Sequence, residues 1–177
     1  MAKQQKETIT IPKGYRPSVR EAIAIDILER IRERTTKEFK DKDNKPFKGY
    51  SKAYVKSLAF NVAGKKESQV NLTLTGDMLD LLEVLDTKKA GKIVIGYDKS
   101  DDATNGKVEG NRLGTYGKSK QVGPKRDFLG IHHKDLKKIL SKYPLDDEIK
   151  LAKRVEKVLE VSKEAEKYDA ESESEDI

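Results

Sequence analysis

The amino-acid sequence predicts an α+β fold, in which helices and short strands are combined in one domain. Residues 18–39 place an apolar residue at every fourth position, which is the pattern of an amphipathic helix. Residues 6–11 and 70–74 instead alternate in side-chain character and are rich in β-branched residues, as strands are, and residues 92–98 form a further short strand pattern. Because the two kinds of element are interleaved and no internal repeat is visible, we expect a single mixed domain.

The composition indicates a modest core and a large charged surface. Charged residues make up 38% of the chain and apolar residues 35%, whereas typical domains have about 25% and about 45–50%. Such a chain suits a protein that completes its burial against neighbours. The absence of cysteine excludes disulfides and thiolate metal sites. Neither a signal peptide nor a membrane-spanning stretch is visible, so we expect synthesis in the cytoplasm and no membrane partner.

The charge is unevenly distributed along the chain. The formal net charge is +6, but residues 164–177 contain seven acids and one base and so carry −6, which leaves +12 on residues 1–163. A basic body with an acidic tail favours a polyanion as a partner, or head-to-tail electrostatic pairing between subunits. A solvated lysine-rich surface is the plainer interpretation of the same charges.

The first predicted elements are a strand and a long helix. Residues 6–11 predict a short edge strand or an extended arm that stops at Pro12. The helix is expected over residues 18–39, and Ser18 with Glu21 matches a capping box at its start. Its buried face is predicted to carry the apolar stripe of Val19, Ile23, Ile27 and Ile31.

Residues 41–46 predict a loop whose aspartates resemble those of a calcium site. An EF-hand loop needs Gly at its sixth position and Glu at its twelfth. Counted from Asp41, these positions hold Pro46 and Lys52, which excludes calcium binding of this kind. Ser51 can cap a second helix that runs to about residue 63. After the strand at residues 70–74, a third helix is expected at residues 78–85, followed by the strand at residues 92–98.

Residues 99–124, rich in Gly, Lys and Asn, predict a long loop with a weak hairpin around Val108 and Tyr116. A loop of this length is uncommon unless it is functional or disordered. A short apolar step at residues 127–131 leads to a fourth helix at residues 133–142. We therefore expect a domain at residues 1–143, an extra C-terminal helix at residues 144–168 and a disordered acidic tail at residues 169–177.

Catalytic and metal-binding motifs are missing from the sequence. Gly117, Lys118 and Ser119 resemble the end of a phosphate-binding P-loop, but position 112, where that loop needs Gly, holds Arg112. His132 and His133 are adjacent and so cannot chelate a metal from one helix face; a surface or capping role is expected instead. We therefore expect neither an enzyme nor a bound cofactor or metal.

Nucleic-acid binding is the main alternative that the residues themselves support. Basic residues concentrate in the middle of the chain, with two tyrosines among them, and such a surface can contact phosphates without reading sequence. No helix-turn-helix, RRM, KH or zinc-finger signature is present. The cluster comprises Lys88, Lys89, Lys92, Lys99, Lys107, Arg112, Lys118, Lys120, Lys125 and Arg126, with Tyr97 and Tyr116.

Four stretches, taken in order, resemble the bacteriophage tail-completion and virion-morphogenesis proteins, a family that includes neck and head–tail joining proteins. The first is the amphipathic helix that ends in Arg34-Thr35, and the second is FKGYSKAY at residues 47–54. The third is VNLTLTGDML at residues 70–79, which is similar to an L-T-G-x-L helix start. The fourth is PKRDFLGI at residues 124–131, which is similar to a P-x-R-x-F-L-G step with Asp127 inserted. Together they cover about residues 15–142.

The resemblance implies an architecture and a place in the virion. It implies a small, mostly antiparallel sheet packed by the N-terminal amphipathic helix and further helices. It also implies a homo-oligomeric ring, such as a hexamer or a dodecamer, at the phage head–tail junction. The partners implied are the portal or connector and the tail proteins, around the axis of DNA passage. A free, basic protein that binds nucleic acid without sequence specificity is the alternative function.

The same reasoning assigns two sets of candidate residues. Basic side chains of the segment 99–124 and its flank would face DNA in the lumen if that segment lines the ring: Arg112, Lys118, Lys120 and Lys125. A second set is expected to maintain the fold or an interface, with Arg126 paired to a carboxylate and Thr75 or Asp77 as a helix cap. That second set comprises Thr75, Gly76, Asp77, Arg126, Phe128 and Leu129.

Overall fold

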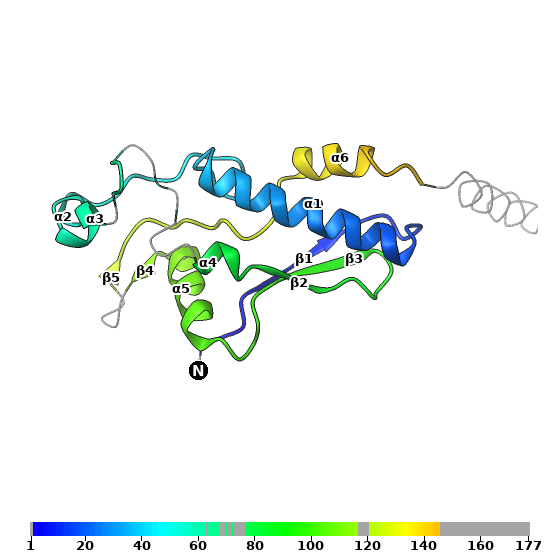
Figure 1. The fold of residues 1–177 in the computed structure, drawn as a ribbon, viewed down its shortest axis with the longest axis horizontal. Helices are drawn as coiled ribbons and strands as arrows, with labels where there is room; N and C mark the ends of the chain where they lie inside the picture. The colour runs from blue at the N-terminus through cyan, green and yellow to red at the C-terminus, as the bar shows by residue number, and fades with distance from the viewer. Residues whose placement is uncertain are drawn as a thin grey trace, which may run out of the picture. The chain divides into compact units, whose positions relative to one another are not determined.

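The computed structural model describes residues 2–62, 64–67, 70, 72, 77–116 and 121–145. The chain divides into two compact units, Met1–Tyr143 and Pro144–Ile177, and every helix and strand named below belongs to the first (Figure 1). The predicted C-terminal helix, the acidic tail and most of the strand expected at residues 70–74 lie outside the described residues. Within these ranges, no helix combines the length and the apolar character needed to cross a membrane.

The sheet is small and antiparallel, as the predicted α+β fold requires. Strand β3 (Lys92–Gly96) lies in the centre, between β1 (Lys6–Thr10) and β2 (Glu83–Asp86). Both pairings are antiparallel, and a bulge interrupts the second between Val84 and Asp86. The predicted N-terminal strand is thus confirmed, and it occupies one edge of the sheet.

Helix α1 (Pro17–Thr36) packs on this sheet and supplies much of the core. Ile23, Ile27 and Ile31 are fully buried, as are Ile93 and Ile95 on β3, which confirms the predicted apolar stripe. The predicted capping box is wrong, because the helix begins two residues earlier. Its N-cap residue is Arg16, without a side-chain cap, and Pro17 follows with its backbone angle already set for a helix.

Helix α6 (His133–Ser141) lies against α1 on the side away from the sheet (Figure 1). This helix was predicted at residues 133–142. The Nδ1 atom of His132 accepts a hydrogen bond from the main-chain N–H of Lys134 at 3.3 Å. His132 is therefore the N-cap of α6, which confirms the capping role expected for the histidine pair.

The segment between residues 51 and 86 is more broken than the sequence indicates. Ser51 caps a helix as predicted, but two short helices, α2 (Lys52–Val55) and α3 (Leu58–Val62), replace the single one expected. Helix α4 (Asp77–Asp80) has only one turn. The remainder of the helix predicted at residues 78–85 is wrong, because Glu83 begins β2 and pairs with Gly96 of β3.

The predicted long loop at residues 99–124 is also wrong, because it contains helix α5 (Asp102–Leu113). The side chain of Asp101 caps its start by accepting from the main-chain N–H of Thr104 at 2.9 Å. Gly114 ends it in the left-handed conformation, with φ of 74°. Val108 is fully buried, so packing compensates for the two glycines inside the helix. A two-stranded hairpin of β4 (Thr115–Tyr116) and β5 (Gln121–Val122) follows, close to where a weak hairpin was expected.

Candidate functional site

Two of the stretches that carry the family resemblance meet inside the molecule. Arg34, in the last turn of α1, donates from Nη2 to the main-chain oxygens of Phe128 and Gly130, at 2.7 and 3.0 Å. Phe128 and Leu129 are completely buried, as expected for core residues. The apolar step at residues 127–131 is therefore held to α1 by one guanidinium group.

Arg34 itself is a buried charge. None of its side chain is exposed, and its Nε and Nη1 atoms have no hydrogen-bond partner among the described residues. Burial, together with the like charge of Arg30, lowers the pKa of Arg34 to about 10. A buried arginine that binds main-chain oxygens fixes two segments relative to each other, because its Nη2 donates to both acceptors at once.

Arg126 holds a third resembling stretch in the same way. Its Nη2 donates to the main-chain oxygens of Lys48 and Gly49 at 3.3 and 3.2 Å, and its guanidinium lies 5.3 Å from the centre of the Tyr50 ring. Tyr50 belongs to an aromatic trio with Tyr54 and Phe60, whose ring centres are 5.3–5.5 Å apart. These contacts of Arg126 are thus to main-chain oxygens and an aromatic face, and a carboxylate partner, within the subunit or across an interface, stays a prediction.

Arg112, expected to face DNA, is occupied inside the subunit. Its Nε lies 2.9 Å from a carboxylate oxygen of Asp127, and its Nη2 lies 3.3 Å from one of Glu7. Nη1 donates to the side chain of Gln5 at 3.3 Å, and Lys42 contacts the other oxygen of Asp127 at 3.0 Å. This network joins α5 to β1. The guanidinium group of Arg112 is therefore paired within the subunit and does not form part of a surface for phosphates.

The remaining candidates fall in three places. Lys125 is exposed and lies beside Gly114, where a Cβ atom would come within 3.0 Å of its Cγ. Asp77 begins α4. The candidates outside the described residues are Thr75, Gly76, Lys118 and Lys120.

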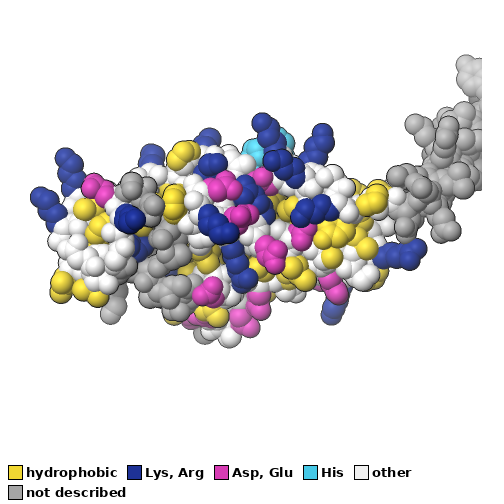
Figure 2. Space-filling view, turned by 45° about the horizontal axis from the view of Figure 1, so that its top comes forward, with side chains coloured by type: hydrophobic (Ala, Val, Ile, Leu, Met, Phe, Trp, Pro, Cys, Tyr) yellow, Lys and Arg dark blue, Asp and Glu magenta, His cyan; other side chains and the backbone are white. Residues whose placement is uncertain are grey.

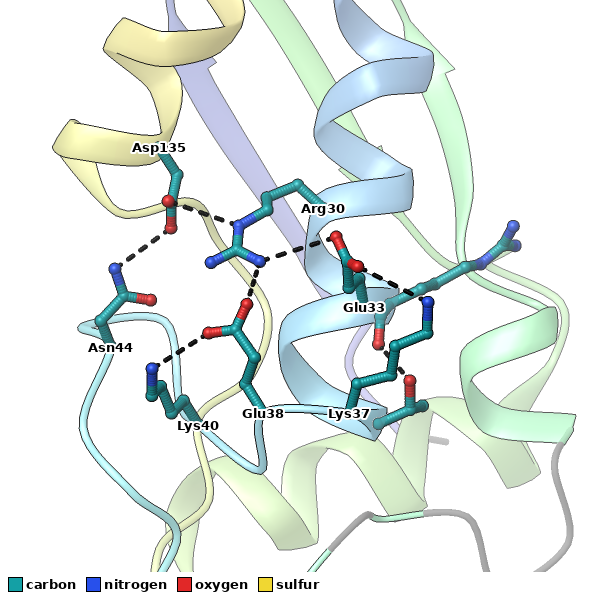
Figure 3. Close-up of polar contacts among 9 residues, drawn as sticks. Arg30, Glu33, Lys37, Glu38, Lys40, Asn44 and Asp135 are labelled. Carbon is teal, nitrogen blue, oxygen red and sulfur yellow. Dashed lines mark hydrogen bonds and ion pairs between the residues drawn. The ribbon is translucent and has the colours of Figure 1, made fainter.

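A polar network joins α1, α6 and the loop after α1 (Figure 3), and the sequence did not predict it. Arg30 lies at its centre: it contacts Glu38 by a short ion pair and Asp135 of α6 at 3.3 Å. Asn44 donates to the other oxygen of Asp135 at 3.1 Å, and Lys40 contacts Glu38 at 3.0 Å. Arg30 and Asp135 are far apart in the sequence, so the spacing of residues along the chain does not predict that they form a pair.

The network lies in an open groove of about 440 Å³ with mixed charges. Figure 2 shows the same mixture on the face it presents, where acidic side chains lie between basic ones near the middle. The hydrogen bond from Arg30 lowers the pKa of Glu38 to about 2, so this carboxylate is a poor proton acceptor at neutral pH. Among the described residues, no cluster of His, Cys, Asp or Glu could hold a metal ion.

The two ends of the β2–β3 hairpin carry opposite charges. We call one end the basic tip: it comprises Lys13, Lys88, Lys89 and Lys92. All four side chains are exposed, and none forms an ion pair with another described residue. We call the other end the acidic pocket: it has a volume of about 260 Å³ and is lined by Asp80, Leu81, Glu83, Tyr97, Asp98 and Asp101.

Sequence reasoning placed Lys88, Lys89 and Lys92 in one central basic cluster with Lys99 and Lys107. The fold separates them, because β3 carries the chain away from the tip before residue 99 is reached. Lys13 joins the tip instead: a Cβ atom on Gly91 would lie 2.9 Å from its Cγ. Antiparallel pairing of β1 with β3 brings these two positions together, and the order of residues alone does not predict that pairing.

Comparison of the chain with protein-family models, with curated proteins and with solved structures gives no match in any of the three.

Proposed function

We propose that this chain is a structural subunit of a bacteriophage virion and builds an oligomeric ring at the head–tail junction. One observation carries the proposal. Three of the four stretches that resemble the tail-completion and virion-morphogenesis proteins, although far apart in sequence, contact one another, because Arg34 binds residues 128 and 130 and Arg126 binds residues 48 and 49. These contacts support the proposal that the three stretches maintain one scaffold.

A scaffold role also fits the chemistry of the polar groups. The most connected carboxylates, Glu38, Asp127 and Asp135, are each held by arginine or lysine in joints between elements. Catalytic acids and bases need pKa values near the working pH, and burial among apolar groups is a usual way to set them there. Here cations instead lower the pKa of Glu38 to about 2 and bind Asp127 and Asp135 in ion pairs between elements, which stiffens a subunit. We therefore propose a structural role and not an enzymatic one.

The proposed assembly has a definite setting. Copies of the chain form a ring, for example a hexamer or a dodecamer, through contacts that close by rotation. The portal or connector binds one face of the ring and tail proteins bind the other, and DNA passes through its centre. The protein is accordingly proposed to be made in the host cytoplasm and built into the virion.

Purified phage particles test this proposal. We expect the chain to be present in a fixed copy number that matches a ring, because a structural ring has one set of positions per virion. Quantitative mass spectrometry against an isotope-labelled copy of the chain measures this number. A particle population without the chain, from cells that express it, would overturn the proposal.

Non-specific nucleic-acid binding is the second candidate, and the basic tip favours it. Four exposed lysines without ion-pair partners among the described residues form a surface to which phosphates can bind. This function predicts binding to any duplex, with an affinity that falls steeply as salt rises, and absence from particles. Duplex titrations across a salt series, compared with the particle analysis, separate the two candidates.

A further inference from the structure

The β2–β3 hairpin separates opposite charges along its own length. Its turn carries the basic tip, whereas its open end carries the acidic pocket. Residue 92 belongs to the tip and residue 98 to the pocket, and a separation of six residues spans up to about 20 Å at the rise of an extended strand. A hydrogen-bonded hairpin cannot fold back on itself, so the two ends cannot neutralise each other within one molecule.

Helix α1 fixes the backbone of the turn that carries the basic tip. Arg20 of α1 donates from Nε to the main-chain oxygen of Thr87 at 2.7 Å and from Nη2 to that of Lys88 at 3.1 Å. Asp86, the last residue of β2, uses a carboxylate oxygen to accept from the main-chain N–H of Lys88 at 2.8 Å. The lysine side chains therefore project from a fixed backbone, which lowers the entropy cost of binding a partner.

The acidic pocket presents four carboxylates, and none of the described residues that line it is basic. Hydrogen bonds from Ser100 lower the pKa of Asp98, and those from Thr104 lower the pKa of Asp101, so both stay charged. Arg32 reaches this region from α1, but it donates to main-chain oxygens of residues 79, 80 and 82. A cation that enters the pocket would therefore meet an excess of negative charge.

Tyr97 adds a second, independent observation, because a residue of the pocket lining carries a buried hydroxyl group without a partner among the described residues. It lines the pocket and is only 1% exposed, and its hydroxyl has no hydrogen-bond partner among the described residues. Buried hydroxyl groups are normally paired. Leu81, which is 49% exposed at the same place, offers an apolar contact for the stem of a lysine side chain.

We propose that copies of this chain associate head to tail, with the basic tip of one copy docked in the acidic pocket of the next. This inference rests on the proposed ring and names the surfaces that build it. The chemistry fits, because lysine ammonium groups supply both the charge and the donors that the pocket lacks. The tip and the pocket are different surfaces of one subunit, so the contact can repeat around a ring.

Charge-reversed variants of the full chain test the contact. Lys88→Glu with Lys89→Glu makes the tip acidic, and Asp80→Lys with Glu83→Lys makes the pocket basic. Each variant alone brings like charges together, so its self-association should weaken about 100-fold or more relative to wild type. Both should sediment at the monomer mass of 20.0 kDa at concentrations where wild type assembles.

An equimolar mixture of the two variants should assemble again. The acidic tip of the first then meets the basic pocket of the second, and the two unchanged surfaces also match. The control is Lys134→Glu with Lys137→Glu on α6, which makes the same charge change at exposed positions away from the hairpin and should assemble like wild type. Circular dichroism and thermal unfolding verify that every variant is folded.

Sedimentation velocity over a concentration and salt series gives the result. Rescue in the mixture, lost at high salt, supports the contact. A wild-type chain that stays monomeric, variants that assemble as wild type does, or a mixture no better than its components would overturn it. Loss of duplex binding in the tip variant with unchanged assembly would also overturn it, and would assign the tip to DNA. Failure here leaves the location of the protein in the virion open, because particle analysis measures that separately.

Discussion

At the scale of single residues, arginine side chains connect segments of this molecule that are far apart in the sequence. Arg34, Arg126 and Arg20 each donate to two or more main-chain oxygens of segments far away in the sequence. The guanidinium group suits this task because its planar donors reach several acceptors at once. The chain has a small apolar core for its length, so such polar joints carry a larger share of its specificity.

Arg34→Met is the sharpest test of such a joint. Methionine fills a similar volume but leaves the oxygens of Phe128 and Gly130 buried without their donor, which should lower the free energy of unfolding by about 2 kcal/mol. The control is Lys37→Met, at a side chain that is 75% exposed, which should change stability by less than about 0.5 kcal/mol. Urea unfolding measures both. Equal effects for the two variants would contradict the role given to Arg34.

The low pKa of Glu38 predicts how the free energy of unfolding changes at acidic pH. Its pKa is about 2 in the folded chain against an ordinary value of 4.5. Because the folded-state pKa is the lower one, its contribution is present above about pH 4.5 and is lost as the pH falls towards about 2. Glu38→Gln should therefore flatten the curve of stability against pH in this window. The control is Glu33→Gln, at a half-exposed residue 3.8 Å from Arg30, which should lower the free energy of unfolding less, because exposed ion pairs contribute little.

At the scale of elements, helix α5 illustrates how end signals and packing outweigh composition. Its sequence includes Gly106 and Gly110, which weaken a helix in isolation. The helix still forms, because Asp101 caps one end, Gly114 closes the other, and Val108 is buried against the rest of the domain.

Two glycine substitutions in and beside this helix should have opposite effects. Gly114→Ala should destabilise the chain by about 1–3 kcal/mol, because its φ is 74° and a Cβ atom would lie 2.5 Å from the main-chain oxygen of Gly123. Gly106→Ala should stabilise it by up to about 1 kcal/mol, because a Cβ atom there has space and helix propensity rises. Thermal unfolding compares them, and a stable Gly114→Ala chain would contradict this assignment of the helix end.

The elements differ in how well the sequence predicts them, for physical reasons. Helices α1 and α6 and strands β1 and β3 have apolar patterns of clear period, and each was predicted to within a few residues. Strand β2 was predicted as part of a helix, because the short apolar run around Leu82 is compatible with both a helix and a strand. Only its pairing with β3 makes it a strand. Helix α5 was missed because Val108 is its one fully buried apolar residue, too few to give a period.

At the scale of the whole molecule, charge is organised by the fold more than by the sequence. The basic residues counted as one central cluster divide between the tip, an internal network around Arg112, and other surfaces. The groove at Arg30 combines residues of α1 and α6, which are far apart in the chain, and the acidic pocket combines residues that precede and follow the β2–β3 hairpin turn. The candidate core residues Phe128 and Leu129 were predictable from their pattern, whereas the tip and the pocket needed the strand pairing.

The central claim is the position of the protein in the virion, and imaging measures that most directly. Purified particles, labelled with an antibody against this chain after mild disruption, should carry the label at the head–tail junction and at no other place. Electron microscopy of negatively stained particles records the label. Particles without label at the junction, although the protein is expressed and its epitopes are accessible, would contradict the proposed ring and leave the basic tip as the leading functional surface.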